Sequence, residues 1–443
     1  METLQPSAEI VSKVLQSQKP SDGTCYRPMA YCVKSDIEKE TLVYNVLTKQ
    51  LVSLTTEEAK IFDQPFIYEE NKVDESARNL IESRFLVPEE HDDYKLCMEV
   101  RKLAKLLGDR KKKTKSYTIL TTTDCNARCF YCYELGRSRI PMSEQTAHEI
   151  ADYISAPKVN IHWFGGEPLY NLPAIDVICN DLQAKGCVYS SQMTSNAYLF
   201  DENLVRKAME FWHLKQVQVT LDGTEPVYNR CKAFIYKEGS AYKRVIRNIG
   251  LLLDADIKVN IRLNIDMHNA DDLFRLVDDV SNQFAGKKGL RVYSHTIFED
   301  TLKQGRSEER RRQLYTKQEL LEEHIRELGL AEKSKLSRFV KVNQCKVDSG
   351  SCEVILPDGH LGLCEHFTED HYIGHISSKE RDKESIRQQR ETIEEASCRT
   401  CPILPSCIRL KICENNLVCY PEEREKKIRN IKRAMKEVGL ENI

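Results

Sequence analysis

Residues 117–134 read YTILTTTDCNARCFYCYE, a β-rich segment that runs directly into three closely spaced cysteines. β-branched and aromatic residues favour a strand in the first half, and Cys125, Cys129 and Cys132 lie just after its carboxyl end. A redox pair needs two cysteines, and a closed tetrahedral metal site needs four ligands. Three thiolates can hold a four-iron cluster and leave one iron open for another ligand. A zinc site completed by a distant histidine, or three unrelated thiols, are the alternatives at this point.

The strand at the start of this segment is the first of a repeating series. Six β-rich segments alternate with five amphipathic segments whose apolar residues have helical spacing. Strict alternation predicts βα units and a parallel sheet. Six strands are too few to close an eight-stranded barrel, so we expect an α/β fold with an open, partial (β/α)6 barrel at residues 116–300, and ligands at the carboxyl ends of its strands. The predicted strands are residues 117–123, 159–165, 187–195, 216–223, 257–266 and 290–298, and the predicted helices are residues 143–154, 173–186, 202–214, 241–255 and 271–285.

The composition limits the class of protein. The chain has 443 residues, of which 41% are hydrophobic and 30% are charged, with a formal net charge of -2. This is enough for two or three domains with a sizeable core, and the balanced charge gives no long-range field for nucleic acid. Met1–Lys13 lacks the apolar stretch of a secretory signal, and no apolar run approaches the roughly 18 residues of a membrane span. We therefore expect a cytoplasmic protein that binds neither nucleic acid nor a membrane.

The segments on either side of the barrel have different patterns. Residues 1–105 combine a predicted hairpin at Thr41–Thr55 with helical spacing after it, which predicts a small winged-helix-like module. Residues 301–341 are charged and predict a bridging helix. Residues 342–425 have almost no periodic signal, so we expect bound metal rather than a large core to hold them. Residues 426–443 predict a basic amphipathic helix that docks on the protein.

Cysteine usage points to metal or catalysis. Seventeen cysteines are many for a cytosolic chain, in which disulfides are rare. Three lie between Cys125 and Cys132, and eight lie between Cys345 and Cys419. The remaining six are scattered, and we expect them to be ordinary small buried hydrophobes.

The CxxxCxxC spacing of Cys125, Cys129 and Cys132, with the aromatic Tyr131 before the last cysteine, resembles the cluster motif of radical S-adenosylmethionine (radical SAM) enzymes. The resemblance implies that the three thiolates hold a [4Fe-4S] cluster whose open iron binds the amino and carboxylate groups of SAM. It also implies that reductive cleavage of SAM yields a 5′-deoxyadenosyl radical, which abstracts a hydrogen atom from the substrate. The resemblance covers about residues 117–297.

Further stretches at the predicted strand ends resemble the same family. WFGGEPL at 163–169 resembles the GGEP motif that meets the SAM amino group, and two glycines let a backbone approach a ligand closely. MTSNAYL matches loosely, because Ala197 stands where the family often has glycine. VTLDG at 219–223 resembles the family's Ser-Leu-Asp-Gly, and the arginine of NIRLNID at 260–266 could pair with the SAM carboxylate or form a structural ion pair. No catalytic acid or base can be named. The SAM-binding residues that the resemblance implies are Tyr131, Gly165, Gly166, Glu167, Pro168, Ser195, Asn196, Thr220, Asp222, Arg262 and Asn264.

The eight later cysteines resemble a SPASM domain, the auxiliary-cluster module of many peptide-modifying radical SAM enzymes. Gly359 precedes Cys364 in a Gly-x4-Cys pattern, and a Cys-x2-Cys-x5-Cys pattern begins at Cys398. The next cysteine departs from the family spacing, which leaves the division of ligands open, and zinc is the alternative for such a pair. The family's interleaving implies two [4Fe-4S] clusters, one on Cys345, Cys352, Cys364 and Cys413 and the other on Cys398, Cys401, Cys407 and Cys419. If Cys352 were not a ligand, one auxiliary iron would be open.

Together these resemblances imply a peptide maturase with SAM and three [4Fe-4S] clusters as cofactors. A hairpin and helices ahead of such a core resemble the element that binds the leader of a ribosomal precursor peptide by adding a strand to an exposed sheet edge. The hairpin at Thr41–Thr55 would supply this edge, with a plain capping role as the alternative. The expected product is a crosslink, preferably a cysteine thioether, and the expected electron donor is a reductant such as flavodoxin or ferredoxin.

Other functions remain open on the sequence. The same scaffold would serve C–C or C–O crosslinking, epimerisation, or a radical SAM dehydrogenase of the sulfatase-maturating kind that acts on a folded protein. A zinc-stabilised interaction protein is the non-enzyme alternative. Iron and sulfide analysis would separate it, since three four-iron clusters need about 12 irons per chain.

Overall fold

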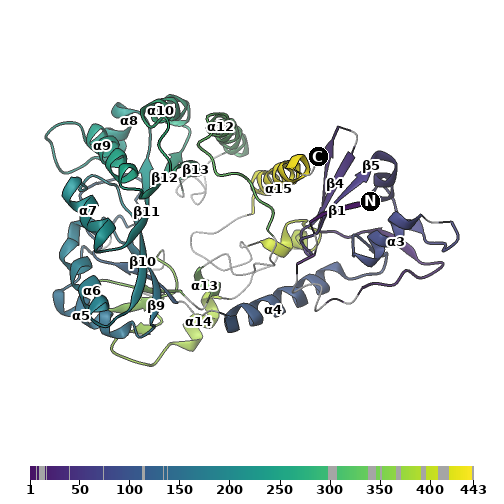
Figure 1. Cartoon of the computed structure of the whole chain (residues 1–443), viewed down its shortest axis with the longest axis horizontal. Helices are drawn as coiled ribbons and strands as arrows, with labels where there is room; N and C mark the ends of the chain where they lie inside the picture. The colour runs from purple at the N-terminus through teal and green to yellow at the C-terminus, as the bar shows by residue number, and fades with distance from the viewer. Residues whose placement is uncertain are drawn as a thin grey trace.

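The structure is a computed structural model, and it describes residues 1–5, 7–8, 15, 17–38, 40–72, 74–111, 115–132, 134–136, 138–297, 307–337, 346–349, 352–365, 371–390, 396–407 and 419–441. Figure 1 shows a curved sheet with helices on its outer face and an amino-terminal module on the open side of the curve. Helices α4 (Asp93–Lys111) and α15 (Pro421–Glu441) lie on the side of the module that faces the barrel. No helix in these ranges is long and apolar enough to cross a membrane.

Six parallel strands form the centre of the molecule, and they confirm the predicted partial barrel. Each strand pairs with the next one along the chain. Alternation along β9 buries Val159, Ile161 and Trp163 against the helices and turns His162 towards the inside of the curve. The six strands are β8 (Lys115–Leu120), β9 (Lys158–Phe164), β10 (Val188–Thr194), β11 (Leu214–Leu221), β12 (Lys258–Ile265) and β13 (Leu290–Thr296).

Three of the helices around these strands begin at side-chain caps. Ser143, Asp201 and Ser240 each accept a hydrogen bond from a first-turn N–H of the helix that follows. The sequence pattern missed one helix, because α8 spans only eight residues and begins at a Thr-Glu-Pro turn. The helices are α5 (Glu144–Tyr153), α6 (Leu172–Ala184), α7 (Glu202–Glu210), α8 (Glu225–Lys232), α9 (Ala241–Asp254) and α10 (Ala270–Gln283).

The carboxyl-terminal cysteine-rich segment extends the barrel sheet. Strand β14 (Cys352–Ile355) pairs in parallel with β8, and β15 (His360–Gly362) and β16 (Gly374–His375) continue the sheet in antiparallel fashion. Buried apolar residues of this segment belong to the same core as the barrel: Ile355, Leu361, Leu363, Ile373 and Ile376. The expectation that residues 342–425 lack a share in a large core was therefore wrong for these residues. The strands β14, β15 and β16 have only four, three and two residues, which is too short to show a periodic pattern in the sequence. The segment also holds α13 (Lys346–Ser349) and α14 (Lys383–Gln389).

In its described residues, the amino-terminal module contains two small antiparallel sheets and the helices α2, α3 and α4. The predicted hairpin is present as β4 and β5, and Thr55 forms a capping box with Glu58 at the start of α2. Helix α4 runs through residue 105, where the sequence pattern placed the end of the module. The larger sheet has the order β1 (Glu2–Gln5), β5 (Leu51–Thr55), β4 (Glu40–Asn45) and β3 (Cys32–Ile37). The other elements are β2 (Cys25–Pro28), β6 (Phe66–Ile67), β7 (Leu86–Pro88), α2 (Thr56–Ala59) and α3 (Glu75–Glu82).

The hairpin does not supply a free sheet edge, contrary to the expectation for Thr41–Thr55. Strand β5 pairs with β1 on its outer side, and β4 pairs with β3. Both hairpin strands are consequently interior to the sheet. The edges of the four-stranded order are β1 and β3, which the sequence pattern did not assign.

Helix α15 docks on the protein, as predicted, and its place is the amino-terminal sheet. Met435 and Ala434 are buried in one core with Leu42 and Tyr44 of β4. A Cβ on Gly439 would lie 3.0 Å from Ile37 and 3.1 Å from Leu42. The predicted bridging helix is α12 (Glu308–Glu327), which packs on α10 and β13 and also contacts α15.

Candidate functional site

The first three cysteines lie on the loop between β8 and α5, at the carboxyl end of the first barrel strand. We call residues 121–132 the cysteine loop. Cys125, Cys129 and Cys132 are half-buried free thiols. Burial raises the pKa of all three, that of Cys125 to about 12. Thiols of this kind must lose their protons when they ligate iron, so cluster binding releases protons.

The cysteine loop is held from outside by the last residue of α8 and the residues after it. Arg128 N donates to Lys232 O at 2.8 Å, and Ile235 N donates to Asn126 O at 2.9 Å. The Arg128 guanidinium donates to the carbonyls of Cys125 and Ala127 inside the loop. These bonds fix the loop backbone, so the positions of the three sulfurs do not depend on the loop alone.

Gly165 and Gly166 bring the end of β9 against the cysteine loop. A Cβ on Gly165 would lie 2.2 Å from Thr122 O, and a Cβ on Gly166 would lie 2.3 Å from Asp124 O. Gly166 N donates to Thr122 O at 3.0 Å, and Glu167 N donates to Asp124 O at 2.9 Å. The two glycines were predicted to admit a ligand. In the structure they admit the backbone that carries the cysteines, which only a residue without a side chain allows.

Glu167 joins the second and third strand ends. Its carboxylate accepts Ser195 Oγ and Asn196 N, both at 2.8 Å, and Leu169 N at 3.2 Å, while Thr121 Oγ1 donates to Pro168 O at 2.9 Å. Burial raises the pKa of Glu167 to about 7, although the three donors oppose the shift. Glu167 therefore links the end of β9 to the end of β10 through hydrogen bonds.

Asn196 reaches back to the first cysteine. Its side-chain amide donates to Asn126 Oδ1 at 2.7 Å and lies 3.8 Å from Cys125 Sγ, which also accepts Ala127 N at 3.3 Å. Ala197 beside it has a φ of 60°, the left-handed conformation that the family's glycine would adopt without strain. The loose sequence match thus keeps the backbone geometry.

Tyr131 and Asp222 meet in a buried network with Lys232. The Lys232 ammonium donates to Tyr131 Oη at 2.8 Å and lies 3.2 Å from the Asp222 carboxylate, which also accepts the Tyr131 hydroxyl at 2.8 Å. Burial and then Asp222 raise the pKa of Tyr131. Burial lowers the pKa of Lys232, but the combined effect of Asp222, Cys129 and Tyr228 is larger and raises that pKa above its usual value. Lys232 was missed in the sequence, where its only sign is a lysine directly before the apolar residues 233–236.

The inside of the barrel is polar. Arg262 and Thr220 are paired neighbours on β12 and β11, and Arg262 Nε donates to Asn264 Oδ1 at 3.0 Å. His162 and Thr194 share a 2.9 Å hydrogen bond. A curved sheet whose inner side chains carry hydrogen-bonding groups can orient a polar ligand next to the cysteine loop.

The later cysteines fall into two places. Cys352 begins β14 opposite Ser116 of β8, and Cys364 packs against the barrel core. Lys346 Nζ donates to Thr118 Oγ1 at 3.0 Å and to Glu365 Oε1 at 2.8 Å, which connects this segment to the barrel. Cys345 and Cys413 lie outside the described residues.

The other place is the carboxyl-terminal cysteine loop, by which we mean residues 396–407. Cys398, Cys401 and Cys407 pack against the core that α4, α15 and the amino-terminal sheet share. Burial raises the pKa of the Cys401 thiol, and its neighbours Cys407 and Cys419 add to the rise. Three of the four predicted ligands are therefore gathered on one short loop, with the fourth near them.

The donor sets fit iron–sulfur clusters. Among the described residues, no three His, Cys, Asp or Glu side chains converge on a point that would hold a single metal ion. The cysteines predicted as ligands offer thiols, which are the ligands of iron–sulfur clusters. The amide donors on Cys125 Sγ are contacts of the kind that tune such a cluster.

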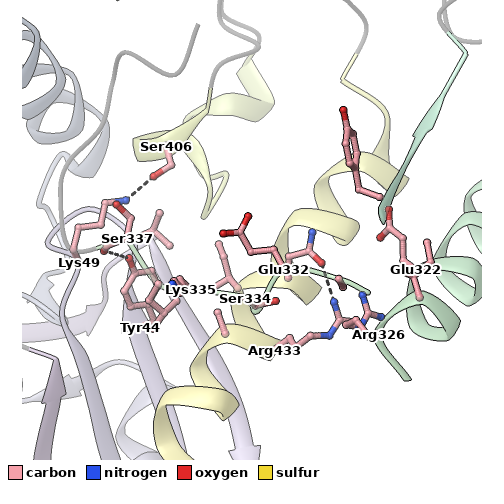
Figure 2. Close-up of a pocket in the computed structure, with 18 of the residues that line it drawn as sticks. Tyr44, Lys49, Glu322, Arg326, Glu332, Ser334, Lys335, Ser337, Ser406 and Arg433 are labelled. Atoms are coloured by element: carbon pink, nitrogen blue, oxygen red, sulfur yellow. Dashed lines mark hydrogen bonds between the residues drawn. The ribbon is translucent and has the colours of Figure 1, made fainter. Parts of the chain in front are cut away.

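A pocket of about 450 Å3 lies where the amino-terminal module meets the barrel (Figure 2). Tyr44 and Lys49 line it from the module, Tyr293 from β13, Arg326 from α12 and Arg433 from α15. Tyr293 Oη donates to a glutamine inside the barrel at 2.7 Å. The pocket thus borders both the module and the barrel interior. Sequence patterns did not predict this pocket, because its walls come from segments that lie far apart in the chain.

Comparison with known proteins identifies the central part of the chain. Residues 119–280 match the radical SAM superfamily. The chain contains a radical SAM domain. The cysteine loop and the strands β9–β12 all lie within that match, so the expectation drawn from the CxxxCxxC spacing is confirmed at the level of the superfamily.

One curated relative matches part of the chain. It is a probable GTP 3',8-cyclase of Methanocaldococcus jannaschii, 27% identical over 180 residues, which are 38% of this chain and 57% of the relative. The chain therefore spans little more than half the length of this relative.

Two solved structures share the fold over most of the chain. Native anSMEcpe with bound AdoMet and Cp18Cys peptide matches with a TM-score of 0.55 at 16% identity, covering 73% of this chain and 98% of that one. Streptococcus suis SuiB bound to precursor peptide SuiA matches with a TM-score of 0.50 at 14% identity, covering 86% of this chain and 94% of that one. At these identities the likeness shows the fold.

Proposed function

We propose that the protein is a radical SAM peptide maturase that installs a crosslink, preferably a cysteine thioether, in a ribosomally made precursor peptide. The observation that carries this proposal is the order of parts along the chain. A radical SAM domain lies between an antiparallel amino-terminal sheet and a cysteine-rich segment that extends the same barrel sheet.

The likeness to SuiB with its bound precursor peptide supports the proposal. It covers 86% of the chain, and the residues after 105 make up less than that share. The shared fold therefore includes part of the amino-terminal module. The peptide in the anSMEcpe structure adds a second similar fold whose bound molecule is a peptide.

At the radical site, Cys125, Cys129 and Cys132 would hold a [4Fe-4S] cluster. When bound, this cluster supplies the electron that cleaves SAM to a 5′-deoxyadenosyl radical. The chain's own residues would orient SAM from the strand ends: Glu167 and Asn196 on one side, and the Arg262 guanidinium, which would pair with the SAM carboxylate. The other residues predicted to contact SAM lie in the cysteine loop and at the strand ends. They are Tyr131, Gly165, Gly166, Pro168, Ser195, Thr220, Asp222 and Asn264.

The later cysteines would form a SPASM-type segment with two auxiliary [4Fe-4S] clusters. Cys352 and Cys364 lie against the barrel, whereas Cys398, Cys401 and Cys407 lie against the amino-terminal module. This separation supports the division into two ligand sets, with Cys345 and Cys413 completing the first and Cys419 the second. These clusters would bind a thiolate of the substrate, or they would accept an electron from the substrate and pass it to a partner such as flavodoxin or ferredoxin.

The leader of the precursor would bind the amino-terminal module at β3. This strand ends the four-stranded order and has six residues, which is longer than the other edge strand, β1. Strand addition at an edge gives affinity through backbone hydrogen bonds. Leader binding should therefore slow hydrogen exchange of residues 32–37 and leave residues 51–55, inside the sheet, unchanged. Protection of residues 51–55 alone would contradict edge binding.

The proposed activity has a direct test. Reconstituted protein, SAM, a reductant and the peptide encoded by a short neighbouring reading frame should yield 5′-deoxyadenosine and a peptide that has lost two hydrogens per crosslink. Replacing Cys125, Cys129 and Cys132 with alanine should abolish both products. Alkylation of the product distinguishes a thioether, which has consumed a cysteine thiol, from a C–C or C–O bond.

Other outcomes would replace the proposal. A peptide of unchanged mass that takes up solvent deuterium indicates epimerisation, and oxidation of a folded protein without a leader indicates the dehydrogenase. Zinc without iron in the purified chain overturns the radical chemistry altogether.

A further inference from the structure

Two cations of the amino-terminal module point at the carboxyl-terminal cysteine loop. Lys49, 2% exposed, donates to Ser406 Oγ at 2.6 Å, as Figure 2 shows. The Arg101 guanidinium donates to the carbonyls of Leu404 at 2.9 Å, Pro405 at 3.2 Å and Cys407 at 3.2 Å. In the described part of the chain, neither cation forms an ion pair with a carboxylate. A buried charge normally has such a partner, because removing it from water is costly.

Lys49 is held in place by an unusual backbone. It lies in the turn between β4 and β5 with a φ of 66°, a conformation that a side chain makes unfavourable. The turn is fixed by Asn45, whose carbonyl accepts Lys49 N at 2.8 Å, and by Gln5, whose amide donates to Lys49 O at 2.5 Å. Glycine or asparagine would satisfy this turn more easily. A strained residue kept in place by its surroundings points to a role for its side chain.

Nothing else nearby in the described structure balances these charges. The Cys97 thiol lies close to Lys49, but burial raises the pKa of Cys97 to about 12, so it remains neutral. Burial lowers the pKa of Lys49 to about 8, as expected for an ammonium without a counter-ion. The anions available at this position are the thiolates that the cysteines become when they bind iron.

We propose that the amino-terminal module supplies the counter-charge of one auxiliary cluster: Lys49 and Arg101 stabilise the negative charge of an iron–sulfur cluster bound by Cys398, Cys401, Cys407 and Cys419. This inference rests on the auxiliary clusters of the proposed function. A four-iron cluster with four thiolates is a net anion, and reduction adds one more negative charge. Two adjacent cations favour the reduced form, so they raise the midpoint potential. The module that binds the leader thus also sets the redox property of a cluster.

The test measures midpoint potentials in the full-length reconstituted protein. A background with Cys125, Cys129 and Cys132 replaced by alanine leaves only the auxiliary clusters to titrate, by EPR-monitored reduction. In it we compare Lys49→Met, Lys49→Arg and Arg101→Gln. The matched control is Lys34→Met, because Lys34 lies in the same module and pairs with Asp63 at 3.0 Å.

Lys49→Met and Arg101→Gln should each move one of the two auxiliary potentials to a more negative value and leave the other unchanged. Lys49→Arg should keep that midpoint potential near the value of the parent protein, and Lys34→Met should change neither potential. If a neutral variant cannot retain its cluster, its iron should fall from about eight to about four per chain, with Lys49→Arg again retaining it.

Unchanged potentials and iron in both neutral variants would overturn the proposal, as would equal effects of Lys49→Met and Lys49→Arg. An otherwise unmodified chain that binds about four irons instead of 12 would overturn the auxiliary clusters themselves. Failure of this proposal alone therefore differs from failure of the proposed function.

Discussion

At the scale of single residues, the most constrained group beside the cysteine loop is the Lys232 ammonium. It and the Asp222 carboxylate are almost fully buried, with exposed side-chain fractions of 5% and 1%. Breaking such a pair leaves an uncompensated charge and costs about 3–5 kcal/mol. Tyr131 connects this ion pair to the cysteine loop, because its hydroxyl forms hydrogen bonds with both Asp222 and Lys232.

Replacing Tyr131 with phenylalanine should loosen the cysteine loop without breaking the ion pair. The ring stays, and Lys232 and Asp222 remain 3.2 Å apart, so the expected loss of stability is about 1–3 kcal/mol. Iron bound at the first site should fall, measured per chain after reconstitution of a variant without the eight later cysteines. Tyr236→Phe, on an exposed ring stacked on Tyr198, is the control and should keep its iron. Full iron in Tyr131→Phe would show that the hydroxyl does not hold the loop.

We expect the fold to lose stability in mild acid because of the buried imidazole of His162. Burial, helped by the Lys346 ammonium, lowers the pKa of this imidazole to about 4 from its usual 6.5. Between these values the unfolded chain takes up a proton that the folded chain does not, so stability is present above pH 6.5 and is lost as the pH falls. The loss at pH 5 should be about 1–2 kcal/mol.

The measurement is the thermal unfolding midpoint at pH 7 and pH 5, under argon, with and without His162→Gln. Between pH 7 and pH 5, the unfolding midpoint of His162→Gln should fall less than that of the parent protein. His148→Gln is the matched control, because the hydrogen bond to Asp181 raises the pKa of His148 and gives a pH effect of the opposite sign. Equal acid sensitivity of His162→Gln and the parent would contradict the assignment.

At the scale of elements, the end of β9 and the cysteine loop act as one unit. Three backbone hydrogen bonds join them, including one from Thr121 N to Phe164 O at 3.2 Å, and both glycines stand where a Cβ would overlap a carbonyl oxygen. The strand end therefore positions the cysteines, and its sequence is restricted by backbone contact.

Gly166→Ala should push the cysteine loop away from β9. The added carbon would meet backbone atoms of Asp124 and Thr123 at 2.3–2.9 Å, which no side-chain rotation can relieve. We expect most of the iron of the first site and all SAM cleavage to be lost while the barrel still folds. Gly250→Ala is the control, since it lies in α9 with its nearest neighbour at 3.7 Å and should gain slightly in helix stability. Normal SAM cleavage by Gly166→Ala would contradict the close contact.

At the scale of the whole molecule, the two ends of the chain form one core. Helix α15 covers the face of the amino-terminal sheet that carries Leu42 and Tyr44, and the carboxyl-terminal cysteine loop packs beside it. Because α15 completes the core of the amino-terminal module, the stability of the module depends on this helix.

Met435→Ala should destabilise the amino-terminal module. Met435 is fully buried, and truncating such a side chain costs about 2–5 kcal/mol. Hydrogen exchange of residues 40–45 should become faster while that of β10, in the barrel, stays the same. Lys436→Ala removes an exposed side chain from the same helix and should change neither. Faster exchange in both regions would mean that the module and the barrel unfold together.

Sequence patterns predicted the barrel because its elements are long and periodic. Six strands and five of the helices around them follow from residues that are near neighbours in the chain, and capping residues mark helix starts. They failed for α8 and for β14–β16, which are too short to show a period. They also misplaced the free edge of the amino-terminal sheet, since pairing partners of a hairpin are not encoded in the hairpin.

The sequence by itself determined the alternating barrel, the three cysteines at its first strand end and the radical SAM domain that contains them. The tertiary structure decided which distant groups meet: Lys232 with Tyr131, β14 with β8, α15 with the amino-terminal sheet, and Lys49 with the loop of Cys407. The physical reason is that local periodicity depends on neighbouring residues, whereas these contacts depend on burial and charge summed over segments that only the folded chain brings together.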